Sequence, residues 1–369
     1  MTAARRFEVA FPLAGFNPSG GVRMLIHVAN ALAARGVAVA VSVPGRAASP
    51  PIPLHPGVTL LVRHSGGGLR PRLAFLTGLP RADVQVATGY QTPVLIRLGA
   101  IMQRAKPHLV YLIQGDEPTS HIRYGARPAW VKAVLRAVAR SGYRVPATRI
   151  AVSRFVAQRV GEDRVHRVIA PGIEPAFLRP LERRPPGDAL VQVGVLSHPA
   201  PAKGTDVALD AFARLRDDAR LRFVVFDGAH ATASPPFVER FSALVGAREL
   251  ARDIDAFFSL CDIFVFPSRV EGFGLPPLEA MARGAAVVVS DCGGVREYVE
   301  PERNCLLVPP GDAAAIAAAI RRLADPELRA RLVRAGRETA ERFPVATFAR
   351  ACADEIQRVL ADATGRNPH

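Results

Sequence analysis

The sequence predicts an α/β protein of two domains, each built on a parallel sheet that is covered by helices. Its 369 residues are enough for two domains of ordinary size, each with a buried core. Hydrophobic residues make up 49% of the chain and charged residues 22%, a balance typical of globular proteins. Short, continuously apolar runs alternate with amphipathic helical stretches, which is the rhythm of strand–helix–strand units.

In the first half of the chain, apolar runs have the length of strands that are buried on both faces. We expect these strands at Phe7–Pro12, Val37–Val43, Val58–Val62, Val84–Ala87 and Leu109–Ile113. Helical patterns lie between several of them, for example at residues 22–35, where the apolar side chains form one stripe. Fully apolar strands separated by such helices indicate a parallel sheet.

This rhythm stops at residues 175–188, which contain four prolines and one glycine and have no periodicity. It restarts with strands expected at Ala189–Leu196, Leu221–Phe226, Ile263–Phe266 and Ala285–Ser290, and with helices from Thr205 and from Pro276. We therefore predict an N-terminal domain at 1–175, a linker at 176–188, a second domain at 189–344, and a helix at 345–369 that crosses back to the first domain.

The chain has a formal charge of +15, with 48 Lys and Arg against 33 Asp and Glu. Such an excess favours phosphates, nucleic acid or an anionic membrane surface as partners. Nearly all of it is arginine and none of it forms one short basic tract, so a GC-rich coding bias explains it equally well. We read no membrane span and no signal peptide, and four cysteines without a CxxC pair favour a reduced, cytoplasmic compartment.

Ligands of open α/β sheets bind beyond the carboxyl ends of the strands, so the loops after strands are the candidate sites. The first such loop, residues 17–22, contains Gly20 and Gly21 at the start of a helix. Glycines allow close approach of the backbone, and a helix start offers unpaired N–H groups to an anion. A glycine turn between a strand and a helix is also common where no ligand binds.

The most informative segment, residues 266–284, leaves a strand, passes Gly272 and Gly274, and enters a helix that we expect to begin at Pro276 or Pro277. It places Glu271 in the loop and Glu279 in the helix. Carboxylates accept hydrogen bonds from vicinal hydroxyls, and glycine amides at a helix start suit a phosphate. Together these features fit a nucleoside-diphosphate sugar. Taken singly, each carboxylate is also explained as a helix-start or solvated charge.

A cation follows the first strand of the second domain. Lys203, one of only three lysines, lies in the loop 197–205 before a helix that we expect Thr205 to cap. Its ammonium group would reach a diphosphate at the same sheet edge. A solvated loop lysine is the alternative.

The Glu-x7-Glu spacing of Glu271 and Glu279 within residues 267–284 resembles the signature of family-4 retaining glycosyltransferases. These enzymes have the GT-B fold, two facing Rossmann-like domains with a deep cleft between them. Weaker matches follow in order along most of the chain, at Gly20–Val22, Val152–Ser153, Pro171–Glu174, Lys203–Gly204, Asp227–Gly228 and Asp262.

The resemblance implies a role for each matching residue. Glu271 would contact the hydroxyls of the donor sugar, and the amides of Phe273, Gly274 and Leu275 would hold sugar and phosphate, next to Gly272. Glu279 would bind the ribose. Lys203 would neutralise the leaving diphosphate, which Gly20 and Gly21 would approach from the other domain. Such enzymes transfer a sugar with retention of configuration to a saccharide or lipid-linked acceptor, for example in cell-surface polysaccharides, by positioning and charge stabilisation.

Two positions depart from the family pattern. Val195 stands where an arginine usually completes the cationic clamp, and His198 and Arg269 are the candidates to replace it. Gln114, Asp116 and Glu117 follow the strand where the family often has a histidine. This resembles a minority, rhamnosyltransferase-like subgroup, and we expect Asp116 to be catalytic together with Glu271 and Lys203.

Other kinds of function have weaker support in the sequence. Asp253 and Asp255 form a DxD, but inside a helical pattern, so we predict no required metal and no cofactor. A sugar-nucleotide-binding protein without transferase activity remains an alternative because of the missing arginine and histidine. Nucleic-acid binding through the arginines is a third reading, and we expect no nucleic-acid partner. The basic excess also fits a peripheral contact with an anionic inner membrane.

Overall fold

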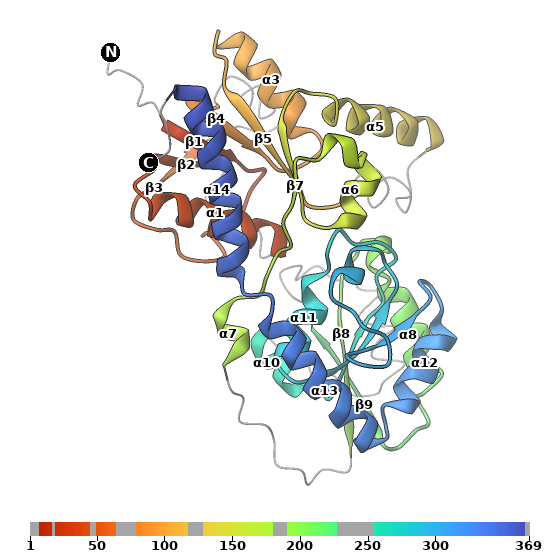
Figure 1. The fold of residues 1–369 in the computed structure, drawn as a ribbon. Helices are drawn as coiled ribbons and strands as arrows, with labels where there is room; N and C mark the ends of the chain where they lie inside the picture. The colour runs from red at the N-terminus through yellow and green to blue at the C-terminus, as the bar shows by residue number, and fades with distance from the viewer. Residues whose placement is uncertain are drawn as a thin grey trace. The chain divides into compact units, whose positions relative to one another are not determined.

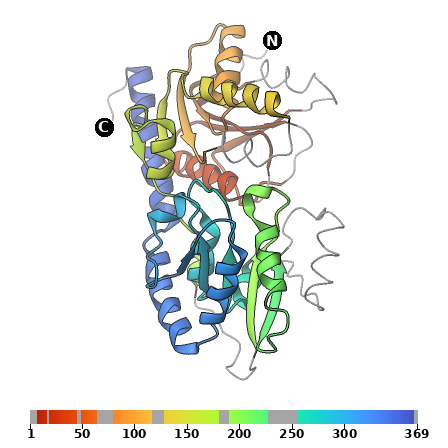
Figure 2. The same ribbon diagram turned by 90° about the vertical axis from the view of Figure 1, so that its right-hand side faces the viewer.

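The computed structural model describes residues 7–16, 19–44, 49–63, 79–116, 128–179, 190–226 and 254–365. The chain divides by its internal contacts into two units, shown in Figures 1 and 2. Of the described residues, unit 1 contains those up to 116, residues 128–171 and the C-terminal segment from 345. Unit 2 contains residues 172–344. The predicted domain and linker boundaries remain predictions.

Unit 1 has a seven-stranded sheet in the order β3-β2-β1-β4-β5-β6-β7, and every pair of neighbours is parallel. The central strands are mostly apolar and buried, as expected for a sheet covered on both faces, although β1 contains Glu8 and β4 contains Asp83 and Gln85. The strands are β1 (Phe7–Pro12), β2 (Val39–Pro44), β3 (Val58–Arg63), β4 (Ala82–Ala87), β5 (His108–Ile113), β6 (Thr148–Ala151) and β7 (Arg167–Val168). The helices are α1 (Gly20–Ala33), α3 (Thr92–Met102), α5 (Ala129–Gly142), α6 (Arg154–Val160), η1 (Glu162–Arg164) and α14 (Val345–Thr364).

The last helix, α14, belongs to unit 1 although it follows unit 2 in the sequence. It lies beside α1 and packs against β4 and β5 (Figure 1). Its buried side chains recur every three or four residues, among them Phe348, Cys352 and Ile356, so one face of the helix is apolar. Among the described residues, no helix combines the length and the apolarity that a membrane span requires.

Unit 2 has a five-stranded parallel sheet in the order β12-β11-β10-β8-β9. Its strands are β8 (Val191–Leu196), β9 (Leu221–Phe226), β10 (Ile263–Phe266), β11 (Ala286–Ser290) and β12 (Leu306–Val308). Its helices are α7 (Pro175–Leu178), η2 (Pro201–Lys203), α8 (Thr205–Ala213), α10 (Ile254–Leu260), α11 (Leu275–Ala282), η3 (Gly294–Glu297), α12 (Ala313–Arg322) and α13 (Pro326–Glu341). The predicted fold class, two Rossmann-like parallel α/β units, is confirmed.

The structure differs from the expected elements in three places. Three short strands, β6, β7 and β12, were not expected, because β7 and β12 have only two and three residues and β6 begins with the polar residues Thr148 and Arg149. The start of the expected linker is helical, since Pro175 opens α7 and Phe177 is buried. α11 begins at Leu275, so its two prolines occupy the second and third positions of the helix.

Candidate active site

Two loops of unit 2 meet at the carboxyl ends of β8 and β10. Gly204 ends the β8 loop with a left-handed backbone, φ +67°. A Cβ at this position would lie 2.0 Å from the carbonyl oxygen of Pro267 in the β10 loop, so only glycine fits. The amide of Arg269 donates a hydrogen bond of 2.7 Å to the carbonyl of Ala202, which ties the loops a second time.

This contact brings Lys203 and Glu271 together. The Nζ atom of Lys203 lies 2.8 Å from Oε1 of Glu271, and Ser268 Oγ donates to the same oxygen at 2.8 Å. Ser268 is buried, whereas the Lys203 side chain is 40% exposed. The Glu271 backbone pairs with the loop after β11, through its amide to Cys292 and its carbonyl to Gly294. A cation and a carboxylate are thus fixed at one edge of the sheet.

The surroundings of Lys203 favour its charged form. Burial lowers the pKa of Lys203, but the charge of Glu271 and its hydrogen bond outweigh burial and leave the pKa above its usual value. Burial first, and then the charge of Glu271, raise the pKa of the neighbouring Cys292 thiol well above its usual value. Lys203 therefore stays an ammonium group and Cys292 a neutral thiol near pH 7.

The start of α11 lies beside the pair. Gly274, with φ +84°, is the residue before the helix, and a Cβ on Gly294 would lie 2.1 Å from the carbonyl oxygen of Gly272. The side chain of Phe273 is buried against Tyr298, so a contact with a ligand would have to come from its backbone. Glu279, on α11, is 2% exposed, and its role as a ribose ligand remains a prediction.

Tyr298 connects these groups. Its buried hydroxyl donates a hydrogen bond to the carbonyl oxygen of Gly274. Burial raises the pKa of Tyr298 well above its usual value, and the nearby charges of Glu271 and Glu279 add to the rise. The hydroxyl therefore remains a donor, and both carboxylates lie close enough to the same ring to affect its ionisation.

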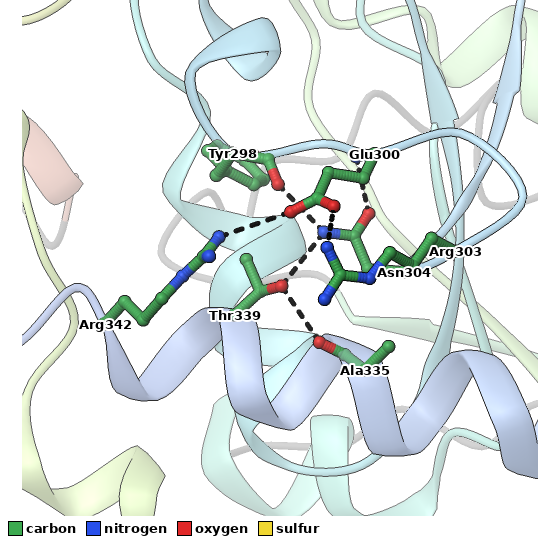
Figure 3. Close-up of polar contacts among 7 residues, drawn as sticks. All are labelled: Tyr298, Glu300, Arg303, Asn304, Ala335, Thr339 and Arg342. Atoms are coloured by element: carbon green, nitrogen blue, oxygen red, sulfur yellow. Dashed lines mark hydrogen bonds and ion pairs between the residues drawn. The ribbon is translucent and has the colours of Figure 1, made fainter.

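The loop that carries Tyr298 is held by a polar network (Figure 3). Asn304 is buried, and its Nδ2 donates to the Tyr298 carbonyl at 2.8 Å and to Thr339 Oγ1 on α13 at 3.0 Å. Its Oδ1 accepts from the Glu300 amide at 2.8 Å. Glu300 also pairs with Arg303 and Arg342. This network fixes the position from which Tyr298 supports the start of α11.

Of the two candidates for the missing clamp arginine, Arg269 is already engaged. Its guanidinium binds both carboxylate oxygens of Asp206, at 2.9 and 2.7 Å, and the carbonyl of Pro201. The hydrogen bond from Arg269 lowers the pKa of Asp206, which burial alone would raise. Arg269 thus joins the β10 loop to the first turn of α8, and its role as a second phosphate cation remains a prediction.

His198 has a structural role in the β8 loop. Its Nδ1 accepts a hydrogen bond from the Ala200 amide at 3.0 Å, so Nε2 carries the proton of a neutral ring. The expected cap at Thr205 is wrong: Gly204 precedes the helix, and the Thr205 hydroxyl bonds the backbone of His198 instead. These bonds shape the loop that presents Lys203.

The remaining predicted residues lie in unit 1. Gly20 and Gly21 begin α1, and a Cβ on Gly21 would lie 2.2 Å from Gln114 Oε1. Gln114 Nε2 also donates to the Gly21 carbonyl at 3.3 Å. Asp116 is buried, and its Oδ2 lies 3.5 Å from Arg159 Nε. Gly21, Gln114 and Asp116 thus gather at the carboxyl edge of the unit 1 sheet.

Several predicted features lie outside the described residues, namely Asn17, Glu117, Asp227–Gly228 and Asp253, as does the linker from residue 180. Within the described ranges, no group of three or more His, Cys, Asp or Glu side chains could hold a metal ion.

The sequence analysis gave no role to Ser268 and did not identify Tyr298. Ser268 lies two residues after the end of the strand at Phe266, within the same loop as Glu271, and its place there could have indicated a role in the site. Tyr298 gave no signal, because its contact with Gly274 spans 24 positions.

The pair and the helix start together define what this edge can do chemically. A fixed ammonium group can offset the charge of a phosphate, a carboxylate can accept hydrogen bonds from hydroxyls, and amides at the start of a helix can donate to an anion.

Comparisons with known proteins agree with this chemistry. Residues 187–325 match the model of the family described as Glycosyl transferases group 1. The chain is 33% identical to a D-inositol 3-phosphate glycosyltransferase of Acidothermus cellulolyticus over 49% of its own length and 45% of that protein. It is 29% identical to the Saccharomonospora viridis protein of the same name, over 89% of this chain and 87% of that one.

Solved structures share the whole fold. A sucrose-phosphate synthase from Thermosynechococcus elongatus superposes with a TM-score of 0.77 at 20% identity, over 97% of this chain and 100% of that one. Anabaena HepE, solved in complex with UDP and glucose, gives a TM-score of 0.73 at 19% identity, over 95% and 99% of the two chains. The resemblance is confirmed at the level of the fold and of one domain: residues 187–325 match a group 1 glycosyltransferase domain and the chain has the GT-B fold, while retention of configuration and the rhamnosyltransferase-like subgroup stay predictions.

Proposed function

We propose that the protein transfers a sugar from a nucleoside-diphosphate sugar to a saccharide or lipid-linked acceptor, with retention of anomeric configuration. The observation that carries the proposal is the direct contact of Lys203 with Glu271 beside the start of α11. The names of the related proteins add support, since HepE was solved with UDP-glucose and the bacterial relatives are D-inositol 3-phosphate glycosyltransferases.

In this proposal Lys203 neutralises the diphosphate as it leaves, and the hydroxyls of the donor sugar bind Glu271. The amides of Phe273, Gly274 and Leu275 donate to sugar and phosphate oxygens, and Glu279 binds the ribose. For the residues of unit 1, we keep the roles that the resemblance implies: contact with the diphosphate for Gly20 and Gly21, and a catalytic role for Asp116. The barrier falls through positioning and through stabilisation of charge on the diphosphate. No metal ion is required, because the ammonium group supplies the countercharge.

Assembly of a cell-surface polysaccharide or glycoconjugate in the cytoplasm is the process that we propose for this activity. A reduced compartment suits the free cysteines, all four of which are buried.

A thermal-shift screen with nucleoside diphosphates and their sugars tests the donor site. A ligand at about 100 times its Kd stabilises the folded state by about 2.7 kcal/mol, which is measurable as a rise in Tm. The ligand that stabilises most is then incubated with the protein, an acceptor and EDTA, and release of the nucleoside diphosphate is followed.

Two results would overturn the proposal. If no nucleotide or nucleotide sugar raises Tm, the donor site is wrongly assigned. If a nucleotide sugar binds but is never consumed with any acceptor, the protein is a sugar-nucleotide-binding protein without transferase activity.

A further inference from the structure

A basic groove lies at the amino edge of the unit 1 sheet. It has a volume of about 740 Å³ and is formed by the end of α3, the segment before β5, the loop before β6 and the residue before β7. The predicted site residues of this unit, Gly21 and Asp116, lie at the carboxyl edge of the same sheet. The groove is therefore separate from the candidate active site.

The lining of the groove has charge of one sign. Its cationic and imidazole side chains are Arg97, Arg104, Lys106, His108 and His166. None of the described residues that line it is Asp or Glu, and within the described ranges no ion pair joins its arginines or its lysine to a carboxylate. Like charges that share one groove without a countercharge attract an anion to it.

The last helix contributes a wall without adding negative charge to the groove. Val359 on α14 lines the groove, and Glu355 lies one turn before it. The carboxylate of Glu355 is buried and pairs with Arg167 and Arg358, so its charge is already balanced.

On α3, charged and apolar side chains face the groove together. Ala100, Ile101 and Arg104 follow Arg97 by three, four and seven positions, which is the spacing of one helix side. The same side of the helix thus offers both cations and apolar surface to a ligand.

Arg104 has a backbone conformation that favours glycine. Its φ is +52°, and it follows the last turn of α3. The amide of Arg104 donates to the carbonyl of Ile101 at 3.1 Å, and that of Ala105 donates to Ala100 at 2.8 Å, which is the pattern of a helix end that usually has glycine at this place. A cation near a helix end also complements the helix dipole, but a neighbouring position would do so without the backbone cost. Such strain is typical of positions where the side chain has a function.

The opposite wall, the loop before β6, is fixed by Arg149. Its guanidinium donates to the carbonyl oxygens of Tyr143 and Val145 at 2.8 and 2.7 Å. It also donates to those of Ala147 and Arg164 at 3.3 and 3.4 Å. These bonds hold the loop in one shape, so a ligand would bind without first having to order it.

The ring of His166 is fixed as well. The Arg149 amide donates to its Nδ1 at 3.1 Å, and the His166 amide donates to the Arg149 carbonyl at 2.9 Å. In a neutral ring Nε2 therefore carries the proton, and it is the nitrogen that remains to donate to a ligand.

The size and the lining of the groove indicate the class of ligand. Sites for small molecules have volumes of about 300–1,000 Å³, and the groove falls within this range. Guanidinium groups bind phosphate oxygens in pairs, while Ile101, Pro107 and Pro146 offer apolar surface to a ring. Inorganic phosphate would leave that surface uncovered, and a nucleic acid would need a longer basic track.

We propose that this groove binds a small phosphate ester, a phosphate group attached to a sugar or a nucleoside. Arg97, Arg104 and Lys106 bind the phosphate, and the ring lies on the apolar wall. This inference goes beyond the proposed function and does not rest on the donor site.

Calorimetric titration of the full chain tests the class of ligand. The probes are glucose 6-phosphate and uridine 5′-monophosphate, compared with glucose, uridine and inorganic phosphate. We expect at least one ester to bind and its unphosphorylated counterpart not to bind at the same concentration. Inorganic phosphate should bind more weakly than that ester by about tenfold or more, because it does not cover the apolar wall.

Matched variants locate the bound ester. Arg97→Gln/Lys106→Gln should weaken its binding by about tenfold or more, since two charged donors to the phosphate are lost. Arg334→Gln/Arg337→Gln removes the same charge from exposed positions on α13 and should bind the ester like the wild type. Lys203→Met should also bind it like the wild type, so a failure of the proposed transferase activity does not affect this test.

Arg104→Gly separates binding from folding. Glycine adopts the left-handed backbone without a steric cost, so Tm should stay the same or rise. The affinity for the ester should fall by about fivefold or more, because a charged donor is lost. If Arg104 only served the helix end, Tm would fall and the affinity would stay unchanged.

The proposal is wrong if neither ester binds, or if the unphosphorylated compounds bind equally well. It is also wrong if Lys203→Met loses the ester while Arg97→Gln/Lys106→Gln keeps it, since the ester then occupies the donor site. Binding of a single-stranded oligonucleotide in place of both esters, lost in the same groove variant, would overturn it in favour of a nucleic-acid surface.

Discussion

Lys203 and Glu271 form an ion pair of 2.8 Å although they are separated by 68 positions in the chain. Their loops follow β8 and β10, which are neighbours in the sheet, and the close contact of Gly204 with Pro267 sets the distance between the loops. The pair therefore links the architecture of unit 2 directly to its proposed chemistry.

The interaction of Lys203 with Glu271 should contribute to both the free energy of unfolding and the rate of transfer. Because Lys203 is 40% exposed, solvent screens the interaction, and we expect a coupling free energy of about 0.5–1 kcal/mol in a double-mutant cycle with Lys203→Met and Glu271→Gln. Each single variant should lose about 100-fold or more in transfer rate, because it removes a group that stabilises the transition state.

Arg322 and Glu302 form an exposed ion pair in the same unit and serve as the control, with a smaller expected coupling and unchanged transfer. Wild-type turnover of donor by folded Glu271→Gln would show that the donor site has been misassigned.

Gly204→Ala should destabilise unit 2 by about 2 kcal/mol or more. The new methyl group would meet the carbonyl of Pro267 at 2.0 Å, in addition to the cost of a left-handed backbone. Gly311 has a similar φ of +81° with nothing within 4 Å of a Cβ, so Gly311→Ala measures the backbone cost alone, about 1 kcal/mol. Chemical denaturation gives the free energy of unfolding of each variant. If both variants lose the same amount relative to the wild type, the close packing at Gly204 is contradicted.

Tyr298→Phe should loosen the start of α11. It removes the hydroxyl that bonds the Gly274 carbonyl but keeps the ring that packs on Phe273 and Phe343. A carbonyl left without its buried donor costs about 1–3 kcal/mol. We expect a lower Tm and weaker donor binding in calorimetry. If Tm falls while the affinity for the donor stays unchanged, the Tyr298 hydroxyl stabilises the fold but does not contribute to ligand binding at the start of α11.

Stability in acid should depend on Asp206. Its pKa is lowered in the folded protein by the hydrogen bond from Arg269, so the pair stabilises the fold above about pH 4. That contribution is lost as the pH falls through the folded-state pKa. Asp206→Asn should therefore be less stable than the wild type at pH 7, by under about 1 kcal/mol, and the difference should shrink below pH 4.

Denaturation midpoints measured between pH 3 and 7 check this prediction. Asp217→Asn, at a position whose side chain is 92% exposed, is the control and should change little. A difference between Asp206→Asn and the wild type that does not vary with pH would contradict the assignment of this titration to Asp206.

The long buried strands and the loop from Glu271 to Glu279 could be predicted because their signals are local. Apolar runs such as Ile263–Phe266 and Leu221–Phe226 coincide with β10 and β9. The support of the site could not be predicted, since the contacts of Gly204 with Pro267 and of Tyr298 with Gly274 join distant segments. Thr205 was misjudged for a related reason: its hydroxyl accepts from the His198 amide and donates to the His198 carbonyl instead of accepting from the first amides of the helix.

Because α14 belongs to unit 1 but follows unit 2 in the sequence, unit 1 is the last part of the protein to be completed during synthesis. A ribosome synthesises all of unit 2 before it reaches the helix that covers α1, β4 and β5. Until then, the apolar surface that later receives Phe348, Cys352 and Ile356 is open to water and to other nascent chains. Fragments that stop before Val345 should therefore keep a foldable unit 2 but yield a unit 1 that aggregates.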